Sequence, residues 1–191
     1  MIDTLLWLLP KARSGDTLDR YGLKSGQYGV VTLHRPANVD QPVTLAGLLE
    51  VLVEVSNRLP LVFPIHPRTK RRIDDFGLTE KLAAVNGAFQ LLPPFGYLDF
   101  LAPTSQAKAI VTDSRGLQEE STVLGIPCLT TRANTERPST VEEGTSTLVG
   151  NDFLKLRHSL QAVLNGSSKR GRCPALWDGH TAERIAAILA G

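Results

Sequence analysis

The stretch "IVTDSRGLQEESTVLGIPCLTT", residues 110–131, joins two apolar runs through a cluster of polar and charged residues. Residues 107–112 predict a buried strand, 116–124 have the pattern of a helix, and 127–131 predict the next strand. A strand followed by a helix and a second strand is the unit from which parallel sheets are built. This stretch therefore predicts an α/β fold.

The same alternation continues along the rest of the chain. Further strands are predicted at residues 28–33, 61–65, 89–94 and 146–149. Helices are predicted at 2–9, 42–59, 69–76, 98–106 with an interruption at Pro103, 139–143, 153–164 and 181–190. Strands rich in Val, Ile and Leu indicate a parallel sheet that is covered by helices on both faces.

Composition excludes several classes of protein. Of 191 residues, 42% are apolar and 21% are charged, which is typical of an ordinary globular protein. A net charge of +2 gives no reason to expect nucleic-acid binding, and no apolar run approaches the roughly 20 residues that a membrane span needs. Cys128 and Cys173 lack zinc-site spacing, so we expect two reduced thiols in a cytoplasmic protein.

Polar or aromatic clusters follow five consecutive predicted strands. They read "HRPANVD", "HPRTK", "PFGYLDF", "DSRG" and "RANTERP". Parallel sheets of this class bind ligands just outside the carboxyl ends of their strands, where these clusters would converge. Any single cluster could be an ordinary loop, but the five together predict a ligand site.

The cluster at the opening stretch has the chemistry of a nucleotide site. Gly116 lies where a strand turns into a helix, whose free N–H groups suit a phosphate, and Ser114 adds a hydroxyl. Glu119 and Glu120 are predicted in the first helical turn, where one carboxylate could accept hydrogen bonds from a ribose diol. The alternative is that both glutamates only favour the helix dipole, and we expect this of one of them.

Other strand-end residues extend this interpretation. A single histidine is usually structural, but His34 and His66 end two neighbouring strands and are each followed by Arg and Pro. Arg137 precedes Pro138 at a predicted helix start, where it could meet a diphosphate. Three aromatic residues belong to the core by default, although one could stack on a base: Phe95, Tyr97 and Phe100. The sequence has no metal-binding, GxSxG, Walker or GxGxxG motif, so neither a metal nor NAD is predicted.

Five segments resemble the C-terminal half of the non-hydrolysing UDP-N-acetylglucosamine 2-epimerases. They are "TLHRPANVD", "PIHPRT", "TDSRGLQEESTVLGIPCLTTRANTERP", "EEGTSTLVG" and "DGHTAERIAAIL". The resemblance implies one half of a GT-B-type architecture, in which two Rossmann-like domains enclose the active site. It also implies interconversion of UDP-N-acetylglucosamine and UDP-N-acetylmannosamine, by elimination and re-addition of UDP, without a cofactor or metal.

The resemblance also assigns roles to individual residues. It makes Glu120 the ribose carboxylate and places Ser114 and Gly116 at the diphosphate. It places His34 where it could assist the departure of UDP. The other residues that it implies near UDP are His66, Phe100, Arg115 and Arg137. Many family members have Gly where this chain has Arg115, which either prevents close approach of the backbone to the phosphate or adds a cation there.

The resemblance implies that residues 1–191 form a single UDP-binding domain. Residues 1–20 would be an N-terminal helix and linker, with Asp3 as a possible N-cap, and 180–190 a C-terminal helix at the domain junction. The N-terminal domain, which holds the proton-transferring carboxylates, would lie outside this chain, so we expect the chain alone to be inactive.

The family also implies a cytoplasmic homodimer that serves polysaccharide biosynthesis. Three alternatives stay open at this point. They are a UDP-sugar glycosyltransferase of the same architecture, a nucleotide-binding module without chemistry, and a hydrolysing relative that releases N-acetylmannosamine.

Overall fold

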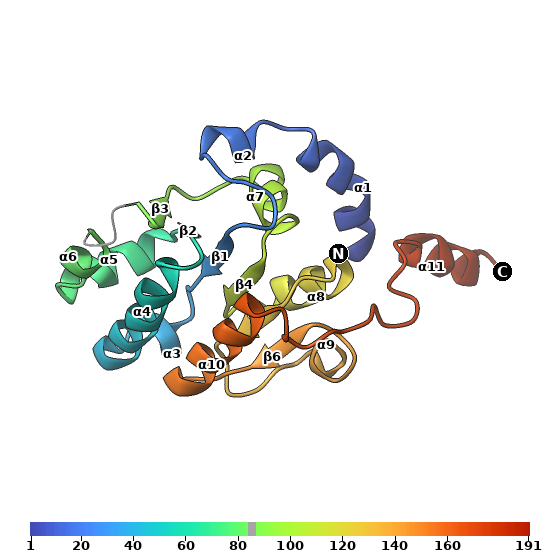
Figure 1. Ribbon diagram of the computed structural model, residues 1–191. Coiled ribbons are helices and arrows are strands. Elements are labelled where there is room, and N and C mark those ends of the chain that lie inside the picture. Colours follow the sequence, from blue (N-terminus) through green and yellow to red (C-terminus); the bar gives the residue numbers. More distant parts are fainter. Residues whose placement is uncertain (84–86) are drawn as a thin grey trace.

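A six-stranded parallel sheet forms the centre of the molecule (Figure 1). The computed structural model describes residues 1–83 and 87–191. Its strands are β1 (Gly29–Thr32), β2 (Leu61–Pro64), β3 (Phe89–Leu92), β4 (Ala109–Thr112), β5 (Cys128–Thr130) and β6 (Ser146–Leu148). Their spatial order is β3-β2-β1-β4-β5-β6, and every neighbouring pair is parallel. The predicted α/β fold with a parallel sheet is confirmed.

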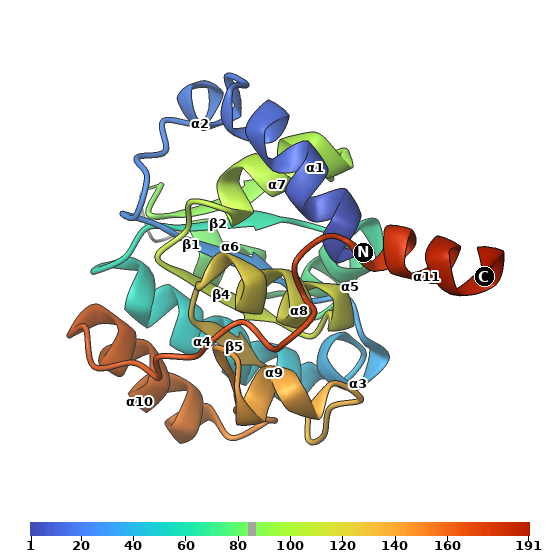
Figure 2. The ribbon, with the colours of Figure 1, turned by 90° about the vertical axis from the view of Figure 1, so that its right-hand side faces the viewer.

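Helices cover both faces of this sheet, as Figure 2 shows. One face packs against α3 (Pro36–Val39), α4 (Pro42–Ser56), α5 (Pro67–Asp75), α6 (Thr79–Ala83) and α10 (Phe153–Leu164). The other face packs against α7 (Tyr97–Thr104) and α8 (Arg115–Leu124), and α1 (Ile2–Arg13) and α2 (Thr17–Arg20) pack in turn against these helices. The remaining helices are α9 (Pro138–Glu142), which contacts α8 and β6, and α11 (Thr181–Ala190), which extends away from the body.

Alternation along each strand builds these two cores. Successive side chains of a strand point to opposite faces, so neighbouring apolar residues enter different clusters. Val30 and Ile110 pack on the α8 side, whereas Val31 and Val111 pack on the α4 side. All four side chains are at most 1% exposed. A strand that is apolar on both faces is buried on both faces, which is why these short strands read as continuous Val and Ile runs.

The strand order reverses between β1 and β4. This reversal indicates the edge of the sheet at which a ligand site is expected. The two strands pair in register from Gly29 with Ala109 to Thr32 with Thr112. The chain leaves β1 toward α4 and leaves β4 toward α8, which lie on opposite faces of the sheet. The crevice opened at such a reversal, beyond the carboxyl ends of the strands, is where folds of this class bind ligands.

Two predictions about helix boundaries are wrong. Helix α8 begins at Arg115 with Ser114 as its N-cap, so Glu119 and Glu120 lie in its second turn and not its first. Their contribution to the helix dipole is correspondingly small. Pro103 does not interrupt α7, because it lies in the last turn, where a missing backbone N–H removes only one late hydrogen bond.

The N-terminal helix also differs from the prediction. It runs to Arg13, and its N-cap is Met1, so the interpretation of Asp3 as the cap of this helix is wrong. Asp3 Oδ2 instead accepts a hydrogen bond of 2.9 Å from the N–H of Ala182, in the first turn of α11. The two ends of the chain are therefore joined. Leu5 is fully buried against α7, whereas Trp7 is 79% exposed.

Three short helices, α2, α3 and α6, were not predicted from the sequence. Each has only four or five residues, which is too few to show a helical period. Both cysteines are free thiols, as predicted. Across the described residues, no helix is long and apolar enough to cross a bilayer.

Candidate nucleotide-binding site

A buried aspartate joins the ends of β1 and β4. The Asp113 side chain is inaccessible to solvent and accepts hydrogen bonds from the backbone N–H groups of His34 (3.0 Å) and Arg35 (2.9 Å). Asn38 Nδ2 donates a further hydrogen bond of 3.0 Å to it, and another of 2.9 Å to the carbonyl of Thr131. The loops after β1, β4 and β5 are thus held together by two buried polar side chains.

The same carboxylate orients a histidine. His34 Nδ1 lies 2.8 Å from Asp113 Oδ1, and the imidazole is 45% exposed. Burial opposes ionisation of Asp113, but the hydrogen bonds from His34, Arg35 and Asn38 outweigh it and hold the pKa of this carboxyl below its usual value. An ionised Asp113 fixes the proton of His34 on Nδ1 and leaves Nε2 for another partner.

The N-terminus of α8 lies directly after this aspartate. Ser114 is the N-cap, and its N–H donates to Thr112 Oγ1 at 2.9 Å. Among the described residues, its hydroxyl forms no capping bond to the helix. The first N–H groups of a helix have no partner within it, so they can bind an oxyanion together with this hydroxyl. A Cβ at Gly116 would meet only Met1 Sδ at 3.6 Å and Ser114 Oγ at 3.9 Å, which leaves room for a ligand.

Arg115 is directed toward an acidic side chain. Its guanidinium forms an ion pair with Glu136, which Arg132 also contacts at 3.3 Å. The side chains of Arg115 and Glu136 are both about half exposed. Arg115 therefore adds a cation beside the start of α8, and Glu136 partly neutralises it.

Glu120 is held by a tyrosine that the sequence alone did not connect to it. The Tyr97 hydroxyl donates to Glu120 Oε1 at 3.0 Å, and Glu120 is 6% exposed. Burial is the main reason why the pKa of Glu120 lies above its usual value, and the nearby charge of Glu119 raises it further. Burial and the charge of Glu120 also raise the pKa of Tyr97, so its hydroxyl stays protonated and can donate.

Glu119 has a different partner from Glu120. Its Oε1 lies 2.9 Å from Arg137 Nε, and its side chain is 14% exposed. The other oxygen, Oε2, is buried and has no hydrogen-bond partner within the described part of the chain. Glu119 therefore positions Arg137, the predicted phosphate-binding cation, while Glu120 is left facing Tyr97.

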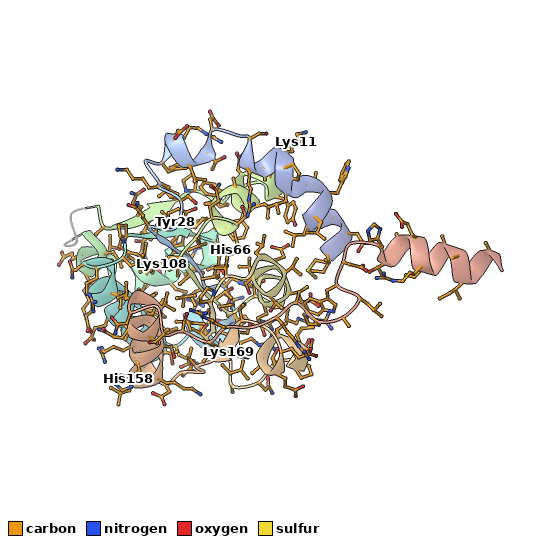
Figure 3. All side chains as sticks on the ribbon, turned by 45° about the vertical axis from the view of Figure 1, so that its right-hand side comes forward. Lys11, Tyr28, His66, Lys108, His158 and Lys169 are labelled. Atoms are coloured by element: carbon orange, nitrogen blue, oxygen red, sulfur yellow. The ribbon has the colours of Figure 1, made fainter. Side chains whose placement is uncertain are left out.

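His66 and Phe100 have contacts different from those of the Asp113 cluster, which comprises Asp113, His34, Arg35 and Asn38. His66 caps α5, because its Nδ1 accepts from the N–H of Arg68 at 3.2 Å. Its ring is exposed, and Figure 3 labels it among the side chains of the molecule. Phe100 is half-buried against the core cluster on the α8 side of the sheet. Within the described part of the chain, no hydrogen bond or ion pair joins His66 to His34 or Glu120, and the predicted roles of His66 and Phe100 stay predictions.

Sequence reasoning missed residues whose role depends on burial. Asn38 is 2% exposed and Gln118 is fully buried, and both carry hydrogen bonds between elements. Gln118 Oε1 accepts from Thr135 Oγ1 at 2.7 Å, which ties α8 to the loop after β5. Asn38 lies within the strand-end cluster "HRPANVD", which was a signal for its role because a buried amide must find partners, whereas Gln118 lies within a predicted helix and carried no such signal.

The sequence model of the UDP-N-acetylglucosamine 2-epimerase family matches residues 1–190. The chain belongs to this family. UDP-N-acetylglucosamine 2-epimerase from Methanocaldococcus jannaschii is 42% identical over 164 residues, which is 85% of this chain and 44% of that protein. The Salmonella typhimurium enzyme of the same name is 27% identical over 88% of this chain and 46% of its own length. The chain spans about half the length of these relatives.

Solved structures of the family have the same fold. A crystal structure of the Methanocaldococcus jannaschii epimerase in complex with UDP-GlcNAc and UDP superposes with a TM-score of 0.86 at 38% identity. It covers 99% of this chain and 52% of that protein. The Neisseria meningitidis epimerase bound to UDP-GlcNAc gives a TM-score of 0.79 at 26% identity, over 99% of this chain and 53% of that one. Residues 1–191 thus match one half of a two-domain enzyme of GT-B type.

Proposed function

We propose that this chain is the UDP-binding domain of a UDP-N-acetylglucosamine 2-epimerase. The observation that carries the proposal is the arrangement around α8. A free helix N-terminus with Ser114 and Gly116 suits a diphosphate, and the buried Glu120 lies about one turn further along the same helix. Such spacing suits a nucleoside diphosphate, whose ribose hydroxyls bind the carboxylate while its phosphates bind the helix end.

The charged side chains around the site favour this orientation of the nucleoside diphosphate. Arg137 and Arg115 are the two predicted phosphate-binding cations, and each is already paired with a carboxylate, Arg137 with Glu119 and Arg115 with Glu136. Both arginine side chains are nearly half exposed, so they can turn toward phosphate oxygens without a large loss of packing. Phe100 and His66 would complete the nucleotide site, at the uracil and beside the nucleotide.

His34 is the catalytic residue that we assign to this half of the enzyme. With Nδ1 held by Asp113, its protonated ring can donate from Nε2 to an oxygen of the departing β-phosphate. The C1–O bond of the sugar breaks, its electron pair leaves with UDP, and the proton on C2 is removed by a base of the companion domain. Return of a proton to the opposite face and re-addition of UDP complete the epimerisation, without net oxidation or reduction.

A companion N-terminal domain is the main partner in this proposal. The α11 stripe, formed by Ile185, Ile188 and Leu189, is 53–82% exposed. The base of α11 is nevertheless fixed, by Asp3 and by the ion pair of Arg184 with Asp178. A helix held in place with an uncovered apolar stripe is suited to pack on another domain. We further propose a homodimer that acts in the cytoplasm and supplies nucleotide sugars for polysaccharide synthesis.

Turnover assays test this proposal. The purified 191-residue chain should convert no UDP-N-acetylglucosamine to UDP-N-acetylmannosamine, because the C2 base lies elsewhere. Mixing it with the separately produced N-terminal half of the Methanocaldococcus jannaschii relative should restore epimerisation, and a His34→Ala variant should lower the restored rate by roughly 100-fold or more. Epimerisation by the chain alone would contradict the division of roles. Transfer of the sugar to an acceptor would indicate a glycosyltransferase, and release of free N-acetylmannosamine a hydrolysing enzyme.

A further inference from the structure

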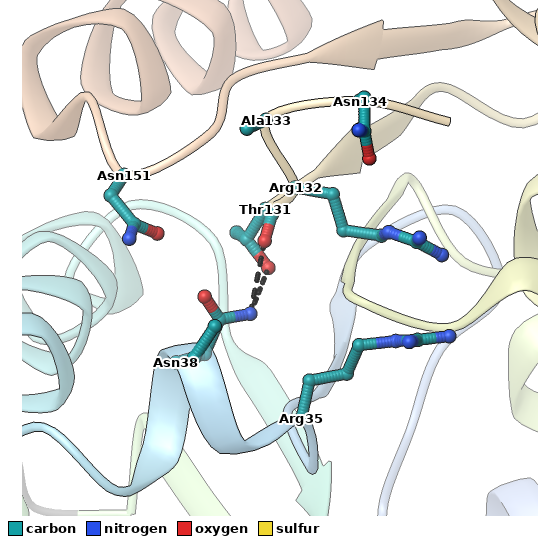
Figure 4. A pocket seen from close by; sticks show the side chains of 8 residues that line it. Arg35, Asn38, Thr131, Arg132, Ala133, Asn134 and Asn151 are labelled. Atoms are coloured by element: carbon teal, nitrogen blue, oxygen red, sulfur yellow. Dashed lines mark hydrogen bonds between the residues drawn. The ribbon is translucent and has the colours of Figure 1, made fainter. Parts of the chain in front are cut away.

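A cavity of about 380 Å³ opens beside the Asp113 cluster (Figure 4). It lies between the loop after β1, the loop after β5 and the turn before α10. The residues that line it are Arg35, Ala37, Asn38, Thr131, Arg132, Ala133, Asn134 and Asn151. This set contains two guanidinium groups and three carboxamides but no carboxylate, so the cavity is cationic and rich in hydrogen-bond donors.

The two arginines of the cavity are held in place, but each retains donors that have no partner among residues 1–83 and 87–191. Arg35 Nε donates to the carbonyl of Asp113 at 3.1 Å. Arg132 Nη2 contacts Glu136 at 3.3 Å, and its side chain is only 11% exposed. Arg132 Nη1 is buried and has no hydrogen-bond partner in the described part of the chain. In Figure 4 the side chains of Arg35 and Arg132 extend in the same direction from their two loops.

This arrangement is unfavourable unless something fills it. A buried donor on a charged group that lacks an acceptor is costly, and two like charges beside one cavity add repulsion. Glu136 is shared between Arg132 and Arg115, so it cannot neutralise both. A planar guanidinium fork matches the paired oxygens of phosphate or carboxylate, which would supply the missing acceptor and balance the charge.

We infer that the cavity between Arg35 and Arg132 is an oxyanion-binding site that lies beside the N-terminus of α8 and is lined by different residues. The bound group is a phosphate or a carboxylate, and the amides of Asn134 and Asn151 can hydrogen-bond to oxygens that flank it. This inference goes beyond the proposed epimerase function, because none of the residues assigned to UDP lines the cavity. The oxyanion has two possible sources, a terminal phosphate of a nucleotide bound at α8 or a separate anion.

Titration of the 191-residue chain with inorganic phosphate at low ionic strength tests the site. We expect saturable shifts of the backbone amide signals of residues 131–134 and 151 in ¹H–¹⁵N spectra. Arg132→Gln should weaken the apparent affinity by about tenfold or more. Asn151→Asp should weaken it by a similar factor, because it places a negative charge in the cavity at an exposed position that the fold does not depend on. Arg157→Gln, which removes the same charge from α10, is the matched control and should leave the affinity unchanged.

The source of the oxyanion is decided by repeating the titration with UDP. If saturating UDP abolishes phosphate binding and itself shifts the same signals, the site takes the phosphate of the nucleotide. If phosphate still binds, the site takes a separate anion. Equal phosphate affinity for wild type, Arg132→Gln and Asn151→Asp, or no saturable shift at millimolar phosphate, overturns the inference. Binding of UDP at α8 could still be intact in that case, so the two proposals fail separately.

Discussion

Replacing Asp113 by Ala should strongly destabilise the fold, because one carboxylate connects three loops. The substitution removes the acceptor of the backbone N–H groups of His34 and Arg35. Asn38 keeps its bond to Thr131, and the half-exposed ring of His34 can turn to water. Two part-buried N–H groups are then left without an acceptor, at about 1–3 kcal/mol each, so we expect a loss of about 2–6 kcal/mol. The urea midpoint would fall by about 1–3 M for a typical m-value of about 2 kcal/mol/M.

The pH dependence of this loss follows from the direction of the pKa shift. The pKa of Asp113 is lowered in the folded protein relative to about 3.9 in the unfolded chain. Its stabilisation is therefore fully present above that unfolded value and is lost as pH falls through the folded pKa. The difference between wild type and Asp113→Ala should be constant near neutrality and should shrink in acid.

Urea denaturation of both proteins at pH 7 and in acid measures these differences. Asp75→Ala is the control, because Asp75 is an exposed carboxylate whose one ion pair among the described residues, with Arg72, is 3.4 Å long. It should cost about 0.5 kcal/mol or less. A loss below about 1 kcal/mol for Asp113→Ala at pH 7 would refute the reasoning.

Three further predictions concern packing and the nucleotide site. Leu5→Ala should lower the free energy of unfolding by about 2–5 kcal/mol in urea denaturation, because Leu5 is fully buried against α7. Trp7→Ala is the control and should cost little, because Trp7 is 79% exposed. Equal losses for the two variants would show that α1 does not pack as described. Gly144→Ala should lower the free energy of unfolding by about 1–3 kcal/mol, because the added Cβ would clash with the Thr122 side chain and would lie 2.7 Å from the Thr140 carbonyl oxygen. Gly15→Ala is the control and should be nearly neutral, because the nearest atom to its added Cβ is 3.4 Å away. The affinity for uridine, measured by calorimetry, should increase as pH rises through the raised pKa of Glu120, because ribose hydroxyls bind a carboxylate better than a carboxylic acid. An affinity that does not change with pH and equals that of Glu120→Gln would contradict the role of Glu120 as the ribose carboxylate.

Much of the fold was predictable because it depends on local pattern. Strands with apolar residues on both faces, such as 109–112, and long helices such as 153–164 have periods that the sequence displays directly. The start of α8 was predicted one residue late, since Arg115 has no side-chain signal that distinguishes a loop from a first helical turn. The role of Asp3 could not be predicted, because its partner Ala182 is 179 residues away along the chain.

The candidate site was predictable in its residue types but not in its pairings. Strand-end rules placed His34 and Ser114 at one edge of the sheet, and in the structure Asp113 joins the ends of β1 and β4 there. They could not show that Asp113 is buried beneath His34, or that Tyr97 reaches Glu120 from another helix. Such pairings depend on how helices pack across the sheet, which a single sequence does not display.

Calorimetric titration of the 191-residue chain with UDP tests the central claim most directly. The account predicts that UDP binds, that uridine binds at least about tenfold more weakly, and that Glu120→Gln weakens UDP by about tenfold or more. Glu142→Gln, at an exposed position of α9, should leave the affinity unchanged. Equal affinity of wild type and Glu120→Gln for UDP, or no binding by the folded chain, would contradict the assignment of this sheet edge as the UDP site.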